Sequence, residues 1–360
     1  MFNPNRLTLA RKRRRLTGQG LARLIGVVPL TISRLEKGKN EPTPETLDAI
    51  AKVLKFPKNF FYGPDIDSSP PDAVSFRSLA SMTAKERDAA LAARDFAYML
   101  SDWVTERFNL PKTDLIDLSS ERNPEKAAIY VRQHWALGQQ AINNMVKLLE
   151  SKGVIVFSLS ENTKNVDAFS CWRNDTPYIF LNTVKSPEHS RFDAAHELGH
   201  LVLHKHGGPH QGKSCESEAN AFASAFLMPE ADIRSRISYT ASISISKLIE
   251  AKKKWGVSVA ALVYRLHKIG LLNEYRFRDL CIQISKFGYK RKEPDSMPRE
   301  ESVVWKKVFT ELWSEGITKN HIADYLDLSF EEVENLVFGL NGLSDNLNSV
   351  KEKGNLRIIS

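Results

Sequence analysis

Two histidines separated by three residues, with a glutamate directly after the first, limit what the middle of this chain can fold into. On an α-helix His196 and His200 lie one turn apart on the same face, so both imidazoles can reach a single ion. Glu197 then projects beside that ion, where its carboxylate can take a proton from a water that the metal acidifies. The pattern predicts a helix from about Ser190 that carries two zinc ligands and a catalytic base.

The next predicted helix, residues 217–226, offers a third ligand at its beginning. The spacing of Glu216 and Asn220 lets the carboxylate bind the metal while the amide orients a ligand histidine. Glu218 is a rival ligand that projects from a different face of the same helix. We favour Glu216 and expect zinc, with manganese as an alternative because a site of two histidines and a glutamate accepts both ions.

The remaining histidines and the cysteines fit a metal or nucleophile role less well. His206 stands where the metzincin motif places its third histidine, but Leu203 replaces the glycine that this motif requires. We interpret His204, His206 and His210 as polar residues of a loop or helix end, one of which could stabilise an oxyanion. No C-x-x-C pair is present, so the cysteines predict no disulfide framework, and Cys215 is interpreted as incidental.

Positive charge is concentrated at the amino-terminal end. Residues 1–60 contain 13 Lys and Arg against 4 Asp and Glu, a net charge of +9, whereas the whole chain carries +8. A basic balance confined to one short segment is typical of a module that binds a polyanion. The overall composition, 42% hydrophobic and 26% charged, is that of a globular protein and gives no indication of long disorder.

Residues 5–61 contain four short helical patterns, two of which suit a helix-turn-helix. Thr17 is a good cap for the second helix, and Pro29 suits the first turn of the third. Ile32 and Leu35 can face the core while outward side chains enter a major groove. The predicted DNA-contacting residues are Thr17, Gln19, Leu30, Thr31, Ser33, Arg34, Lys37 and Lys39. We also expect the run from Arg11 to Arg15 to lie near phosphates.

The chain resembles two known families. Residues 21–22, 26–27 and 31–38 are similar to the phage-repressor (XRE) helix-turn-helix family, and the likeness covers about residues 5–61. Residues 178–182, 191–204, 216–223 and 226–229 resemble the ImmA/IrrE metallopeptidase family, with likeness from about residue 75 to 272. This second resemblance implies a zincin-type fold and proteolysis of a transcriptional repressor. The two modules also occur fused in this order in phage-like or toxin–antitoxin-like regulators.

We therefore expect an α+β fold in three parts. Residues 1–65 form an all-α helix-turn-helix domain, residues 75–272 a zincin-like metallopeptidase domain with a small β-sheet, and residues 273–360 a helical carboxy-terminal region. The predicted strands are 153–159, 168–172 and 178–181, and the predicted helices include 84–108, 124–135, 139–152, 243–272, 303–316, 318–326 and 330–340. A second helix-turn-helix-like pattern covers residues 317–340, but Glu331, Glu332 and Glu334 would be repelled by phosphates. This region is expected to pack or to contact protein.

Two functions fit these observations. The first is a DNA-binding regulatory zinc metalloendopeptidase that recognises a double-stranded operator and cleaves a repressor or related regulator. The alternative is a repressor or antitoxin whose metal domain senses a ligand or dimerises without proteolysis. Glu197 favours the first, since a purely structural zinc site has no need of that carboxylate.

The setting and assembly of the protein can also be predicted. The sequence has no signal peptide, and no window is apolar enough to span a bilayer, so we expect a cytoplasmic protein without membrane contact. The oligomeric state stays open from sequence, and a homodimer is one of the assemblies that it allows, since helix-turn-helix modules of this type usually bind paired half-sites. A small helical bundle used only for dimerisation is the alternative interpretation of residues 5–61.

Overall fold

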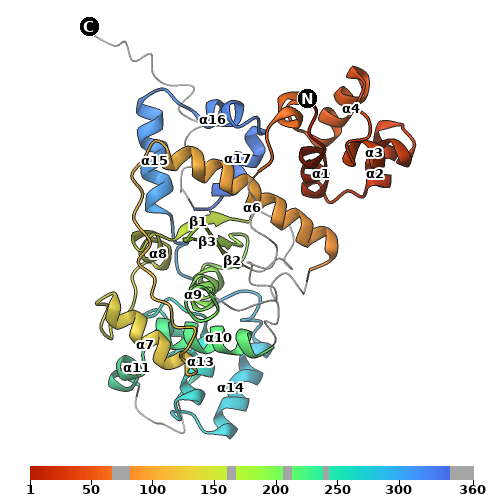
Figure 1. Ribbon diagram of the computed structural model, residues 1–360. Helices are drawn as coiled ribbons and strands as arrows, with labels where there is room; N and C mark the ends of the chain where they lie inside the picture. The colour runs from red at the N-terminus through yellow and green to blue at the C-terminus, as the bar shows by residue number, and fades with distance from the viewer. Residues whose placement is uncertain (67–81, 160–167, 206–212, 238–242, 341–360) are drawn as a thin grey trace, which may run out of the picture.

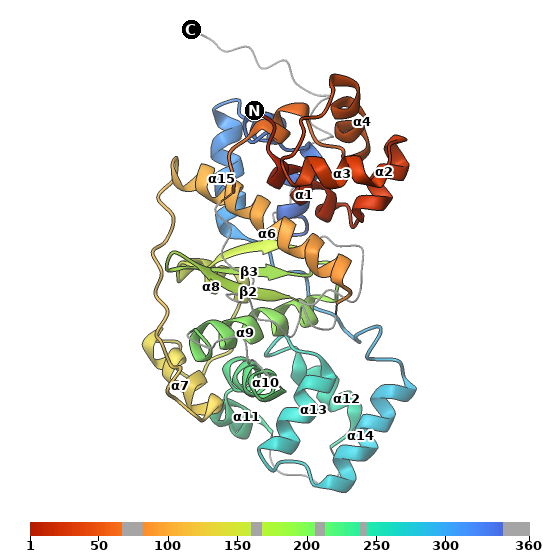
Figure 2. The ribbon, with the colours of Figure 1, turned by 45° about the vertical axis from the view of Figure 1, so that its right-hand side comes forward.

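The computed structural model describes residues 1–66, 82–159, 168–205, 213–237 and 243–340. A three-stranded sheet lies in the middle of the molecule, with helices on both of its faces and the amino-terminal helices at one end (Figures 1 and 2). This arrangement confirms the predicted α+β fold.

The amino-terminal helices form a small bundle with its own core. They are α1 (Pro4–Arg13), α2 (Gly18–Ile25), α3 (Pro29–Glu36), α4 (Pro44–Leu54) and the 3₁₀ helix η1 (Lys58–Tyr62). Thr17 caps α2 as predicted, because its side chain accepts a hydrogen bond from the backbone N–H of Gly20. Ile32 and Leu35 of α3 are buried, as the helix-turn-helix pattern requires.

Helix α6 (Ala84–Thr105) connects this bundle to the sheet. On one side, the ring centroid of Phe96 lies 5.5 Å from that of Phe56 in the amino-terminal bundle. On the other side, the ring of Tyr98 packs edge-on against Tyr178 of the sheet, with centroids 4.9 Å apart. Aromatic pairs at these separations add to the stability that burial alone provides. The helix is therefore buried between two layers.

The sheet is built from the three predicted strands. Its strands are β1 (Ile155–Ser158), β2 (Phe169–Arg173) and β3 (Thr176–Leu181), arranged β1-β3-β2. Strand β1 pairs with β3 in parallel, and β2 pairs with β3 antiparallel. Asn174 and Asp175, at φ 47° and 61°, form the tight hairpin between β2 and β3, where both residues must adopt left-handed backbone.

Two predicted helices differ from the structure. The helix predicted over 139–152 is confined to α8 (Met145–Ser151), which begins only after the side chain of Asn144 caps it. The region predicted as helical over 243–272 is divided into α12 (Ile245–Lys252) and α13 (Val259–Lys268). Gly256 lies between them with φ at +63°. Left-handed backbone of this kind cannot continue an α-helix, so the predicted helix is interrupted here.

Below the sheet lies a layer of helices that carries the motif histidines. Helix α9 (Pro187–Leu203) contacts β2 and β3, and α10 (Lys213–Leu227) packs beneath α9 (Figure 2). The other helices of this half are α7 (Pro124–His134), α11 (Glu230–Arg236), α12, α13 and α14 (Glu274–Lys286).

The carboxy-terminal helices return to the sheet instead of forming a separate body. They are α15 (Val303–Ser314), α16 (Lys319–Tyr325) and α17 (Phe330–Val337). The indole Nε1 of Trp305 donates to the carbonyl of Val156 in β1 at 2.6 Å, and the Trp305 ring lies 5.0 Å from that of Phe157. Helix α17 contacts both α6 and β1.

A buried carboxylate joins α17 to α1. Glu332, whose side chain is 1% exposed, accepts from Nε of Arg13 at 2.7 Å and from Nη1 of Arg14 at 2.5 Å. Arg11 is also engaged internally, with Nε 2.6 Å from Glu36. The expectation that the run from Arg11 to Arg15 lies near phosphates is therefore wrong for these three arginines. Internal carboxylates and carbonyls take their donors because the run forms the end of α1, which contacts α3 and α6 and reaches Glu332 of α17.

Replacing Glu332 with glutamine should destabilise the protein by about 3 kcal/mol, because it leaves two partly buried guanidinium groups without their counter-charge. The matched control is Glu331→Gln, which removes the same charge from a side chain that is 59% exposed. Its ion pair with Lys55, at 3.7 Å, is loose. That variant should change stability by less than about 1 kcal/mol. Urea denaturation of the full chain, followed by circular dichroism, measures both. Equal effects of the two variants would show that the Glu332 pair does not join α17 to α1.

Candidate functional site

Helix α9 places the motif histidines on one face. It begins at the Ser186 cap, whose side chain accepts from the backbone N–H of His189, and Pro187 occupies its first turn. Along this helix His196 and His200 point the same way, and their Nε2 atoms are 3.0 Å apart. The His200 side chain is almost fully buried.

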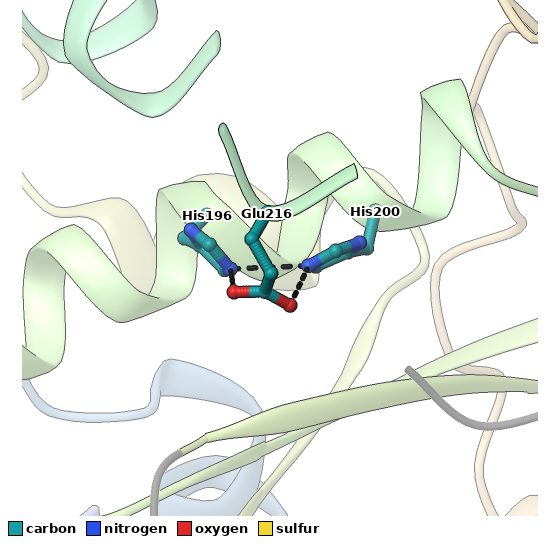
Figure 3. A group of neighbouring side chains, drawn as sticks. All are labelled: His196, His200 and Glu216. Atoms are coloured by element: carbon teal, nitrogen blue, oxygen red, sulfur yellow. Dashed lines mark hydrogen bonds and ion pairs between the residues drawn. The ribbon is translucent and has the colours of Figure 1, made fainter. Parts of the chain in front are cut away.

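Glu216 reaches this pair from α10. Its carboxylate oxygens lie 3.5 Å from Nε2 of His196 and 3.4 Å from Nε2 of His200 (Figure 3). Donor atoms about 2.0–2.1 Å from a tetrahedral zinc stand about 3.3 Å from one another. The separations of 3.0, 3.4 and 3.5 Å among these donors fit a single small ion. The residues present therefore suit zinc, with two imidazole nitrogens and one carboxylate.

Gly199 permits the helix contact on which this convergence depends. A Cβ at this position would lie 3.1 Å from Cδ1 of Phe222 and 3.3 Å from Cα of Ala219 in α10. Both distances are tighter than ordinary packing, and the second involves backbone that cannot easily shift. The glycine inside the motif thus lets α10 approach α9 closely enough to present Glu216.

Outer partners fix the orientation of both histidines. Nδ1 of His196 lies 3.1 Å from Oδ1 of Asn220, an atom that can only accept, so this nitrogen carries the proton and Nε2 keeps its lone pair. Nδ1 of His200 lies 3.0 Å from Nδ1 of His204, whose Nε2 is 3.1 Å from a carboxylate oxygen of Glu218. If Nδ1 of His200 donates to His204 and Nε2 of His204 donates to Glu218, Nε2 of His200 keeps its lone pair for a metal.

The two candidate glutamates have different neighbours in the structure. Glu216 faces the histidine pair, whereas Glu218 contacts His204 and accepts from the hydroxyl of Ser214 at 2.7 Å. His204 is the residue that follows the last turn of α9, and sequence reasoning had assigned it no contact with the ligands. His206 and His210 lie outside the described residues. Cys215 lies near His204 and Glu218, and these three could also hold an ion.

Glu197 lies on the sheet side of α9 and is 2% exposed. The hydroxyl of Ser170, in β2, donates to Oε2 of Glu197 at 2.7 Å. Burial raises the pKa of Glu197 to about 7, although His196 and the Ser170 hydrogen bond oppose this shift. A carboxyl group with this pKa can both accept and return a proton near neutral pH. Ser170 was missed because a serine inside a strand pattern carries no signal of its own.

The electrostatics of the ligand set suit a cation. Burial lowers the pKa of His200 to about 4, which keeps its imidazole neutral as a metal ligand must be. For Glu216, burial opposes ionisation, but the influence of the neighbouring His196 and His200 outweighs it and lowers the pKa of the carboxyl group. The pair of neutral imidazole and ionised carboxylate is the protonation state that metal binding requires.

The predicted DNA-contacting residues gather on and around α3. Gln19, Leu30, Arg34, Lys37 and Lys39 are exposed, and Thr31 and Ser33 are half-buried. Thr17 is exposed but is occupied as the cap of α2. The arrangement agrees with a helix that presents one face to a groove and the other to the core.

The described residues include no helix that is long and apolar enough to cross a membrane.

Comparisons with known proteins find similarity in the amino-terminal helices and in the segment that contains the histidine pair. Residues 7–61 match a family model described as helix-turn-helix, and residues 149–267 match a peptidase family model described as the IrrE N-terminal-like domain. The second match contains the histidine pair, Glu197 and Glu216. A search of curated proteins returns no match. Residues 7–61 are therefore similar to helix-turn-helix domains and residues 149–267 to the IrrE N-terminal-like peptidase domain, in agreement with the two resemblances found in the sequence.

Proposed function

We propose that this protein is a DNA-binding regulatory zinc metalloendopeptidase that cleaves a transcriptional repressor or a related regulator. The observation that carries the proposal is the position of Glu197. It follows His196 directly in α9, its charge acts on that histidine, and it belongs to neither candidate ligand group, while a serine hydroxyl holds its carboxylate in place. A structural zinc site needs no such group, whereas hydrolysis of a peptide needs a base of this kind.

The residues divide the chemistry among them. His196, His200 and Glu216 would hold zinc, and zinc when bound supplies Lewis acidity toward water and the peptide carbonyl. Glu197 accepts a proton from the attacking water and then delivers it to the leaving amide nitrogen, so that the C–N bond breaks as a free amine forms. Ser170 holds Oε2 of Glu197 during both transfers. Asn220 and the His204–Glu218 pair keep the ligand imidazoles in the required tautomer.

The helix-turn-helix domain supports a regulatory role. We propose that α3 enters the major groove of a double-stranded operator, with Arg34 nearest to base edges and Lys37 and Lys39 near phosphates. Gln19, Leu30, Thr31 and Ser33 complete this face, and Thr17 supports it as the cap of α2. Such a domain would bring the metal centre to operators and to the repressors bound there, as a homodimer if the operator has two half-sites.

The Glu197→Gln variant should lose 10²–10⁴-fold of its cleavage rate, roughly the contribution of a positioned general base. Purified protein is incubated with zinc or manganese and with the repressor encoded beside its gene, and the fragments are followed by mass spectrometry. Zinc content and operator affinity should remain those of the unchanged protein. If the repressor stays intact and the variant regulates normally in cells, the domain acts as a sensor or dimerisation unit instead.

Metal binding distinguishes the ligand from its supporting residues. Glu216→Ala should abolish zinc binding, whereas Asn220→Ala and Glu218→Ala should weaken it by about 10–100-fold, because they only release a ligand histidine. Competition with a chromogenic chelator gives these affinities. Glu230→Ala is the control, since Glu230 is an exposed residue of α11 paired with Arg234. Complete loss of zinc in Glu218→Ala, with Glu216→Ala unaffected, would reverse the assignment.

Two substitutions in the DNA-binding face should have different effects. Arg34→Ala should cost about 1–3 kcal/mol on the operator and relax specificity at one base pair, whereas Lys39→Ala should weaken binding to all sequences and reduce the salt slope by about 1. Fluorescence anisotropy with an operator selected from random duplexes measures both. The control is Lys52→Ala, an exposed lysine of α4. Equal losses for all three variants would contradict the assignment of α3 as the reading helix.

A further inference from the structure

Positive charge also gathers at the end of the molecule opposite the helix-turn-helix. Residues 245–292, which include α12, α13 and α14, contain 12 Lys and Arg against 3 Asp and Glu, a net charge of +9. Both ribbon views place α14 at the far end of the molecule from α2 and α3 (Figures 1 and 2). The near-neutral balance of the chain outside residues 1–60 conceals this local excess.

The charge is densest where α14 ends. Residues 286–292 contain Lys286, Lys290, Arg291 and Lys292 and no acidic residue. All four side chains are exposed, and no carboxylate of the described segments lies within ion-pair distance of any of them. These cations therefore face solvent without compensation. Like charges held this close repel one another, so the cluster costs stability unless an anion binds to it.

The backbone under these side chains is fixed. Gly288, at φ +71°, ends the helix, and the N–H groups of Arg291 and Lys292 both donate to its carbonyl, at 2.9 and 3.1 Å. The next residue, Glu293, accepts from the backbone N–H of Val259 at 2.7 Å and lies 3.3 Å from the ammonium of Lys252. A turn anchored at both ends presents its cations in one place, which reduces the entropy lost when an anion binds.

The amino-terminal bundle has paired much of its own charge, as have the residues before this cluster, where Lys252, Lys253, Arg265, Arg276 and Arg278 pair with carboxylates. Arg11, Arg13 and Arg14 are paired with Glu36 or Glu332, and Lys58 pairs with Asp48. Such pairs contribute little to a field that attracts phosphate. The helix-turn-helix thus has fewer free cations than its sequence suggests, and a second basic surface would supply affinity that it lacks.

We propose that residues 286–292, at the end of α14, form a second DNA-contacting surface that binds duplex phosphates without reading sequence. Charge complementarity identifies the partner class, and the presence of a DNA-binding domain on the same chain favours DNA over another polyanion. The inference is independent of the metal site and of peptide cleavage.

The test uses the full chain with the reading helix disabled by Arg34→Ala, Lys37→Ala and Lys39→Ala. In this background the protein should still bind a random-sequence duplex. Affinity for the duplex falls as salt rises from about 50 to 200 mM. Adding Lys290→Gln and Lys292→Gln should reduce this fall by about 3-fold for each phosphate contact that is removed. The matched control adds Lys306→Gln and Lys307→Gln, two exposed lysines of α15 that carry the same charge change.

Three results would overturn the proposal. The first is absence of duplex binding in the disabled background, and the second is an equal salt slope for the two double variants. The third is a loss of binding to phosphatidylserine vesicles in the Lys290/Lys292 variant with duplex binding unchanged, which would identify a membrane-facing surface. All four lysines are exposed, so the circular dichroism spectrum and the zinc content of both double variants should match those of the unchanged protein. A change in DNA binding can therefore be distinguished from a failure of the metal site.

Discussion

The approach of α10 to α9 is the contact on which the candidate metal site depends. Gly199 leaves room for Phe222 and for the backbone of Ala219, so the two helices lie closer than side chains of ordinary size would allow. The first turns of α10 then supply three different groups to α9: a carboxylate for the histidine pair, an amide for His196 and a second carboxylate behind His204. One helix-helix contact thus sets both the ligands and their orientation.

Much of the site could be predicted because it depends on local spacing. The interval between His196 and His200 determines their shared face on any helix, and the interval between Glu216 and Asn220 does the same on the next. Ser170 and His204 could not be assigned in this way. Ser170 approaches Glu197 only because β2 lies against α9, and His204 is placed by the last turn of the helix and by a partner on α10.

The fold shows the same division between local and distant causes. The β-rich runs predicted the three strands, since aromatic and branched residues fit a pleated, half-buried surface. The pattern over 139–152 was helical by periodicity, but the Asn144 cap delays the start of the helix. Charge was the least predictable property. The basic run in α1 suggested a position near phosphates from sequence, yet Glu332 of α17, about 320 residues further along the chain, neutralises two of its arginines.

That neutralisation has a geometric consequence for a protein bound to DNA. Because Glu332 holds α1 while α6 packs against both the bundle and the sheet, contacts within the fold set the angle between α3 and α9. Two copies on a two-fold symmetric operator would therefore direct their metal centres along fixed, symmetry-related lines from the duplex axis. A metal centre would reach a repressor on neighbouring DNA only if the exposed segment of that repressor lay in one of these two directions. Helical phasing between adjacent binding sites would then decide which regulators are accessible.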